Sequence, residues 1–228
     1  MQSDDRKLEA SHVVANCRMN RQRGLASYTS ELRFDPRQIL AARLANSPGA
    51  AWLDMCCGSG AALAEAAKLY RNAGLERRVF ICGIDLAGMF VSQARNYPNL
   101  RLQKDSVHRW HAPQQFDLIT CVHGLHYVGD KLGLIARALG WLTPNGLFAA
   151  HLDLANLKLA DRSSFTGALG RQFKALGLHY HRGFHLVTCQ GQREVRFAYE
   201  YQGADDLAGI NFTGQEAVDS YYRRLAPQ

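Results

Sequence analysis

Apolar runs of strand length alternate with helical segments along most of this chain, and this alternation restricts the fold more than any other feature. Strands are predicted over 51–55, 79–84, 100–105 and 116–122, and helices over 60–73, 87–96 and 130–141. The run Phe116–Val122 is almost continuously apolar, as is typical of a strand buried on both faces of a parallel sheet. We therefore expect a doubly wound α/β fold with a mostly parallel sheet of seven strands.

The later part of the chain departs from this alternation. A turn at 143–146 leads into a fifth strand over 147–152, and a further helix is predicted over 162–176. Two more strands, over 184–189 and 194–199, are separated by only four residues, which is too few for a parallel crossover. The sheet is therefore predicted to end in an antiparallel hairpin formed by these two strands.

The two ends of the chain carry weaker patterns. Residues 1–47 are predicted to form a helical N-terminal cap, in which Asp35 and Pro36 start the last helix. Residues 48–201 would form the α/β domain. Residues 202–228 would form a tail that packs on that domain, with a short helix over about 214–224.

The first predicted strand runs into Cys56–Gly60, a glycine-bearing turn that opens the next helix. Gly58 and Gly60 let the backbone approach a ligand where a Cβ would obstruct it. Asp85 stands at the carboxyl end of the second strand, where a carboxylate can accept from both hydroxyls of a ribose. Together these features indicate a ligand of the adenosine type.

These residues resemble the Rossmann-like (class I) S-adenosylmethionine-dependent methyltransferases over about 52–201. Leu53–Gly60 is similar to the family's first motif, an acid followed by Gly-x-Gly-x-Gly, with Cys56 in place of the first glycine. Gly83–Met89 is similar to the second motif, in which the acid holds the ribose. Further similar segments are Asp105–Val107, Phe116–Cys121, Leu125–Val128 and Leu142–Gly146.

The resemblance implies S-adenosylmethionine as cofactor, bound outside the carboxyl ends of the strands. Gly58 and Gly60 would admit its amino-acid part, and Asp85 would hold the ribose. Met89 would pack on the adenine, and Asp105 would accept from the adenine amino group. The full predicted set is Asp54, Cys56, Gly58, Ser59, Gly60, Asp85, Leu86, Met89, Asp105, Ser106, Val107 and Val122.

Two residues of the first motif are open to more than one interpretation. Asp54 either faces the ligand or is satisfied by nearby backbone N–H groups. Cys56 makes the loop bulkier than usual near the methionine part of the cofactor. We expect its thiol to point into the sheet, because Met55 and Cys57 flank it in an apolar run.

Methyl transfer from a sulfonium requires an acceptor held in line and the removal of any proton that the acceptor carries. His123 and His126 follow the fourth strand, and a neutral imidazole can take such a proton. We predict both as catalytic, with His123 as the general base or the group that orients the acceptor. His126 also coincides with a histidine common in the family, which would instead fix the loop by a hydrogen bond. His123, Tyr28 and His151 are predicted to contact the acceptor, although Tyr28 also fits as a core residue.

The formal charge of +7 comes from scattered lysines and arginines, whose clusters hold two or three residues each. Solvated faces explain such clusters. The six cysteines lie mostly in or beside apolar runs, as buried thiols in a reducing compartment do. No cysteine or histidine spacing predicts a metal site. The sequence shows no signal peptide and no membrane span, so a cytoplasmic protein without a membrane partner is expected.

The leading function is methyl transfer to an oxygen, nitrogen or carbon atom of a small molecule. One alternative is an RNA-modifying methyltransferase that uses the basic segment with Arg18, Arg21 and Arg23. Another is an NAD(P)-dependent oxidoreductase, although Leu63 stands where Gly-x-Gly-x-x-Gly needs its third glycine. A cofactor-binding protein without catalysis is a further alternative. The acceptor and the oligomeric state are left open.

Overall fold

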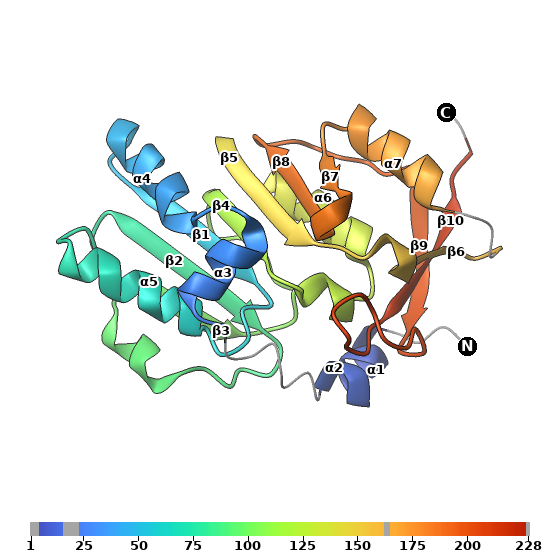
Figure 1. Cartoon of the computed structure of the whole chain (residues 1–228), viewed down its shortest axis with the longest axis horizontal. Helices are drawn as coiled ribbons and strands as arrows, with labels where there is room; N and C mark the ends of the chain where they lie inside the picture. Colours follow the sequence, from blue (N-terminus) through green and yellow to red (C-terminus); the bar gives the residue numbers. More distant parts are fainter. Residues whose placement is uncertain (1–4, 16–22, 162–164, 227–228) are drawn as a thin grey trace.

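The structure is a computed structural model that describes residues 5–15, 23–161 and 165–226. Its centre is a seven-stranded sheet in the order β3-β2-β1-β4-β5-β8-β7 (Figure 1). The parallel strands are β1 (Ala50–Met55), β2 (Val79–Asp85), β3 (Leu100–Lys104), β4 (Phe116–Cys121) and β5 (Leu142–His151). The last two strands, β8 (Leu186–Gln190) and β7 (His179–His181), form an antiparallel hairpin beside β5. The predicted fold class is confirmed.

Helices cover both faces of the sheet, which explains why its central strands are mostly apolar. The strands β1 and β4 are buried at every position. Successive residues of β1 enter different cores, since Trp52 packs with the N-terminal helices and Leu53 packs on the opposite face. The helices of the first core are α3 (Leu25–Leu32), α4 (Pro36–Asn46) and α5 (Ala61–Asn72), and those of the second are α6 (Lys131–Gly140) and α7 (Thr166–Ala175).

The predicted N-terminal helical cap is present in the described residues. It consists of α1 (Asp5–Glu9), α2 (His12–Ala15), α3 and α4. The Asp35 side chain caps α4 by accepting from the backbone N–H of Arg37 at 2.9 Å, and Pro36 is the first helical residue. The start of this helix was therefore predicted correctly.

Within the described ranges, no helix has the length and apolar content needed to cross a membrane.

Two predictions for the last third of the chain are wrong. The hairpin is β7–β8 rather than 184–189 with 194–199, and residues 191–198 form no strand. A second sheet instead joins β9 (Tyr199–Asp205) to β10 (Asp219–Arg224), with β6 (Leu157–Leu159) on the other side of β10. The helix predicted over 214–224 is thus mostly strand β10, because long-range pairing with β9 outweighs the local helical pattern.

The helix predicted over 87–96 is also largely wrong. Only the short 3₁₀ helix η2 (Ser92–Asn96) forms there. Gly88 adopts a φ of 65°, a left-handed conformation that interrupts a right-handed helix. The segment after β2 is consequently an irregular loop beside the end of the sheet.

The turn predicted at 143–146 lies within β5, at a shift in its register with β4.

A buried lysine joins the second sheet to the main domain. Lys131 is the first residue of α6 and is fully buried. Its ammonium donates to the carbonyls of Val128 at 2.9 Å and Val218 at 2.8 Å, and to the Ser220 hydroxyl at 2.7 Å. Ser220 lies in β10, so a single side chain holds this strand against the start of α6.

Replacing Lys131 by Met is expected to lower the free energy of unfolding by about 2 to 4 kcal/mol, because buried acceptors lose their donor. Urea unfolding would measure the change. Lys68→Met, on the exposed face of α5, is the matched control and should stay within about 0.5 kcal/mol of the parent. Equal stability of the two variants would contradict the role given to Lys131.

Candidate functional site

A cavity of about 260 Å³ opens at the carboxyl ends of the parallel strands. In the strand order, β1 lies between β2 and β4, so the chain winds away from β1 in both directions. Ligands of open α/β sheets bind at such a switch point. The wall is formed by Glu9 and Val14, by Cys56 and Gly58, and by the segments 85–87, 105–108, 122–124 and 127–128.

Most of the predicted cofactor-binding residues meet at this cavity. Those in its wall are Cys56, Gly58, Asp85, Leu86, Asp105, Ser106, Val107 and Val122. The wall does not include Asp54, Ser59, Gly60 or Met89. Of the predicted catalytic and acceptor-contacting residues, His123 is in the wall, whereas Tyr28, His126 and His151 are not.

Two carboxylates stand side by side in the cavity wall at the ends of β2 and β3. Asp85 accepts from the backbone N–H of Gly58 at 3.0 Å and of Ala87 at 2.9 Å. Asp105 accepts from the backbone N–H of Ser106 at 2.7 Å. These bonds fix both acids at the cavity. A ligand with ribose hydroxyls and an adenine amino group finds acceptors of the right kind here.

The loop after β1 has an unusual backbone at Cys56. Its φ is 60°, close to the 59° of Gly58, in the region that favours glycine. The Cys56 thiol lies near the Cys121 thiol of β4, while the residue also borders the cavity. This contact and burial raise the pKa of Cys56 well above its usual value. Cys56 is therefore a neutral thiol at pH 7.

Asp54 lies beneath this loop, in a polar network inside the core. Its carboxylate accepts from the Tyr28 hydroxyl at 2.7 Å and from the Thr120 hydroxyl. Thr120 in turn accepts from the Trp52 indole N–H at 2.8 Å. Asp54 is thus satisfied by two side-chain hydroxyls, and not by the backbone N–H groups that one of its two interpretations required. Tyr28 is buried and packs edge-on against Trp52. This position fits the second interpretation of Tyr28, that of a core residue.

Three histidines gather beyond the end of β4. The His123 ring stacks on His151, with centroids 4.1 Å apart, and lies 5.6 Å from the His126 ring. All three are buried, and burial lowers the pKa of each, to about 3 for His151. Neither ring nitrogen of His126 has a hydrogen-bond partner, so its ring does not form the expected loop-fixing bond.

Two further residues of this region had no signal in the sequence. Glu31, in the last turn of α3, places Oε2 3.0 Å from Nε2 of His123 and 4.0 Å from Nε2 of His151. Phe212, in the loop between β9 and β10, stacks on His185 with centroids 3.9 Å apart and meets the His126 ring edge-on at 5.3 Å. The N-terminal cap and the second sheet therefore both reach the histidines.

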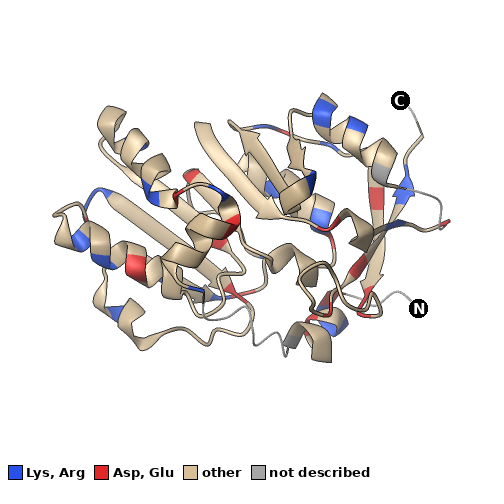
Figure 2. Cartoon of the chain, viewed as in Figure 1, with Lys and Arg blue, Asp and Glu red and all other residues tan. Residues whose placement is uncertain are grey.

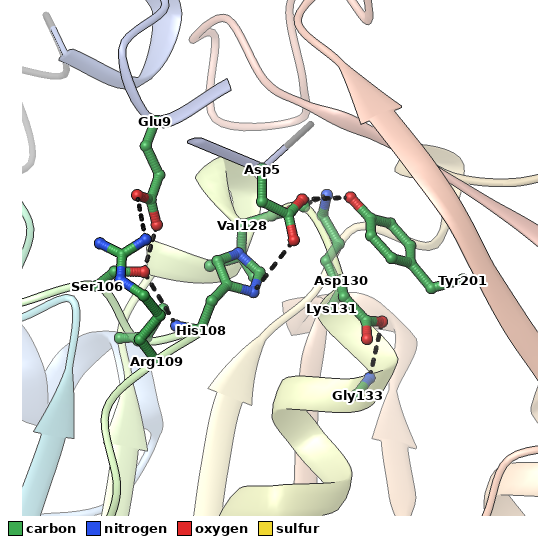
Figure 3. A network of polar contacts seen from close by, with 12 residues as sticks. Asp5, Glu9, Ser106, His108, Arg109, Val128, Asp130, Lys131, Gly133 and Tyr201 are labelled. Atoms are coloured by element: carbon green, nitrogen blue, oxygen red, sulfur yellow. Dashed lines mark hydrogen bonds and ion pairs between the residues drawn. The ribbon is translucent and has the colours of Figure 1, made fainter. Parts of the chain in front are cut away.

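The helix α1 is tied to the side of the cavity by a network of polar contacts (Figure 3). Glu9 accepts from the Ser106 hydroxyl and pairs with Arg109 at 3.3 Å. Asp5 accepts from the Tyr201 hydroxyl of β9 at 2.6 Å and lies 3.8 Å from Nδ1 of His108. Glu9, which the sequence also did not reveal, thereby becomes part of the cavity wall.

Comparison with known proteins gives the family. A profile described as a methyltransferase domain matches residues 21–193. The chain belongs to the class I S-adenosylmethionine-dependent methyltransferases. S-adenosylmethionine is accordingly the cofactor of this methyltransferase, and the alternative of an NAD(P)-dependent oxidoreductase is wrong.

The methyltransferase is also similar to one curated protein, the uncharacterized 37.1 kDa protein in transposon TN4556 of Streptomyces fradiae. The two are 25% identical over 217 residues, which are 85% of this chain and 60% of that protein. The chain thus spans less than two thirds of the length of this relative.

Solved structures similar to the methyltransferase include CalS10, an amino pentose methyltransferase from Micromonospora echinaspora involved in calicheamicin biosynthesis, with SAM bound. The TM-score is 0.42, with 21% identity over 68% of this chain and 60% of that chain. Another is the N-methyltransferase NodS from Bradyrhizobium japonicum WM9 in complex with S-adenosyl-l-homocysteine. Its TM-score is 0.38, with 16% identity over 64% of this chain and 71% of that chain.

Replacing Asp85 by Ala in the methyltransferase is expected to weaken S-adenosylhomocysteine binding about 100-fold, because the variant lacks the carboxylate that we predict to accept from the ribose hydroxyls. Isothermal titration calorimetry would measure the dissociation constant. Glu194→Ala is the control, since that side chain is 85% exposed and lies outside the cavity wall. An unchanged dissociation constant in a folded Asp85 variant would remove this acid from the cofactor site.

Asp54 should make the stability of the methyltransferase depend on pH. Burial raises its pKa to about 7, so the folded chain keeps a proton that the unfolded chain releases near pH 4. The stability contributed by the neutral acid is full below about pH 4 and is lost as the pH rises towards 7. The side chain in Asp54→Asn cannot titrate. Over this pH range the free energy of unfolding of the variant should therefore fall less than that of the parent, with a difference of as much as about 4 kcal/mol. Urea unfolding at pH 4.5 and 7.5 tests this, and equal pH dependence in both proteins would contradict it.

Proposed function

We propose that this methyltransferase acts on an oxygen, nitrogen or carbon atom of a small-molecule acceptor. The observation that carries the proposal is the position of His123, which borders the cofactor cavity and belongs to the buried histidine cluster. An acceptor that reaches His123 would have to enter a confined space between the end of β4, the helix α3 and the loop that carries Phe212. Small molecules suit such a space better than polymers do.

The distribution of charge also supports a small acceptor over RNA. Lys and Arg are dispersed over the molecule, with acidic residues among them (Figure 2). Among the described residues, the cavity wall contains three acids, Glu9, Asp85 and Asp105, and no Lys or Arg. Of the basic N-terminal segment, Arg18 and Arg21 lie outside the described residues, while Arg23 is 3.7 Å from Glu31. RNA binding depends on basic side chains that face phosphates, so this wall is unfavourable for it.

When bound, S-adenosylmethionine supplies a methyl group on a positively charged sulfur. Asp85 and Asp105 would hold the sugar and the base, and the glycine loop after β1 would face the amino-acid part. The acids in the wall give the cavity a negative charge that suits a cationic ligand. The residues of the chain thus contribute mainly binding and orientation, which is what an in-line displacement needs.

His123 would orient the acceptor or take its proton. Burial lowers the pKa of His123, so the ring is neutral at pH 7. Glu31 lies within hydrogen-bond distance of Nε2 and fixes the orientation of the ring. A neutral, oriented imidazole at the wall of the cavity is suited to either role.

His123→Ala is expected to lower turnover about 100-fold or more and to leave the dissociation constant of S-adenosylhomocysteine nearly unchanged. His179→Ala, on the exposed edge strand β7, is the control and should keep normal turnover. Near-normal turnover of the His123 variant would remove this residue from the mechanism.

The acceptor class is tested by incubating the chain with S-adenosylmethionine that carries a labelled methyl group. Panels of small phenols, amines and carbon acids would be compared with total RNA. Label in a small molecule is the expected result. Label in RNA alone would contradict the proposal.

A further inference from the structure

Glu31, His123 and His151 bring three potential metal ligands together from three separate elements. One ligand atom of each residue lies within 4.8 Å of those of the other two, the one group of this kind in the part of the chain that the structure describes. Oε2 of Glu31 is 3.0 Å from Nε2 of His123 and 4.0 Å from Nε2 of His151. Ligand atoms that each lie about 2.1 Å from a tetrahedral ion are about 3.4 Å from one another. The distances from Oε2 of Glu31 to the two imidazole nitrogens, 3.0 and 4.0 Å, lie on either side of this value.

We propose that Glu31, His123 and His151 form a binding site for one divalent transition cation of the zinc, cobalt or iron(II) type. Two imidazoles and one carboxylate are the ligand set of many catalytic zinc and non-haem iron sites. Magnesium and calcium prefer oxygen ligands, of which the cluster offers only one residue's carboxylate. The His123 and His151 planes are 13° from parallel, and binding would rotate the two rings so that both lone pairs face one ion.

Unsatisfied nitrogens lie beside the proposed ligand atoms in the same cluster. Nδ1 of His123, Nδ1 of His151 and both ring nitrogens of His126 are buried without a hydrogen-bond partner. Buried polar atoms are normally paired by protein, water or a bound ion. A cation on the two Nε2 atoms would leave these four nitrogens to be paired by water, so the cation site rests on the spacing of the three ligand atoms.

The carboxylate of Glu31 is also held in a suitable way. Nε of Arg23 lies 3.7 Å from Oε1, while Oε2 faces the imidazoles. A basic partner on the outer oxygen orients a ligating carboxylate, as neighbours of metal ligands commonly do. Because His123 borders the cofactor cavity, the open positions of the cation would be available to an acceptor atom. With the cation bound, His123 would orient the acceptor through the cation and would not take its proton. This role of the cation as a Lewis acid rests on the proposed function.

The site is tested by titrating the full chain, treated with a chelator and then freed of it, with Co²⁺. The expected result is one Co²⁺ per chain, with visible absorption typical of nitrogen and oxygen ligands and no thiolate charge-transfer band. Glu31→Gln and His151→Asn should each lower the Co²⁺ affinity at least 10-fold, and His179→Asn should leave it unchanged. Circular dichroism and thermal unfolding of the metal-free variants would show that they fold.

Three results would overturn the cation site: no stoichiometric Co²⁺ binding, equal binding by the parent and both ligand variants, or a spectrum dominated by thiolate ligands. S-adenosylhomocysteine binding by the metal-free chain and by Glu31→Gln separates this proposal from the proposed function. If that binding is intact while Co²⁺ does not bind, only the cation site is wrong. If the metal-free chain does not bind S-adenosylhomocysteine, the proposed function fails whether or not Co²⁺ binds.

Discussion

The hydrogen bonds that Asp85 accepts from Gly58 and Ala87 hold the functional end of the molecule together. The bond from Gly58 joins the loop after β1 to the end of β2, and the bond from Ala87 fixes the turn that follows Asp85. Both loops belong to the proposed cofactor site. The rest of the site is arranged around this junction. Asp105 at the end of β3 and Val122 at the end of β4 reach the same cavity because their strands are parallel neighbours in one sheet. A carboxylate can bridge these loops only where both strands end at the same edge.

The proposed acceptor side is assembled differently, from parts that lie far apart in the sequence. The helix α3 supplies Glu31, the end of β4 supplies His123, and the end of β5 supplies His151. The loop between β9 and β10 adds Phe212 over the same cluster. The proposed cofactor side is thus built mostly at the ends of the first four strands, with Glu9 and Val14 added from the N-terminal cap. The proposed acceptor side combines the ends of β4 and β5 with Glu31 and Phe212, which lie outside the main sheet. Additions of this kind are where proteins with one fold come to differ in function.

The sequence was informative where local patterns decide the structure. The parallel strands could be predicted from apolar runs such as Phe116–Cys121. These runs are apolar because helices bury both faces of the sheet. Local patterns failed in the second sheet, because β10 is a strand only through its pairing with β9. They failed again after β2, where the backbone of Gly88 overrides a helical composition.

The same limit applies to the candidate site. Motif spacing predicted Asp85, Asp105 and the glycine loop as site residues, since each follows a strand that can be recognised, and Asp85, Asp105 and Gly58 lie in the cavity wall. Glu31 and Glu9 belong to short cap helices whose polar residues carry no spacing signal, and only the tertiary structure brings them to the cavity and the histidines. A cation site was not predicted for this reason, since its three residues belong to no local motif.

The buried contact of Lys131 has a consequence for biosynthesis. The hydroxyl of Ser220 that accepts from its ammonium lies 89 residues further along the chain. While a ribosome makes the intervening segment, the parallel core can form, but this ammonium must remain hydrated at the edge of an unfinished structure. During synthesis, closure of the second sheet therefore has to wait until β10 has left the ribosome.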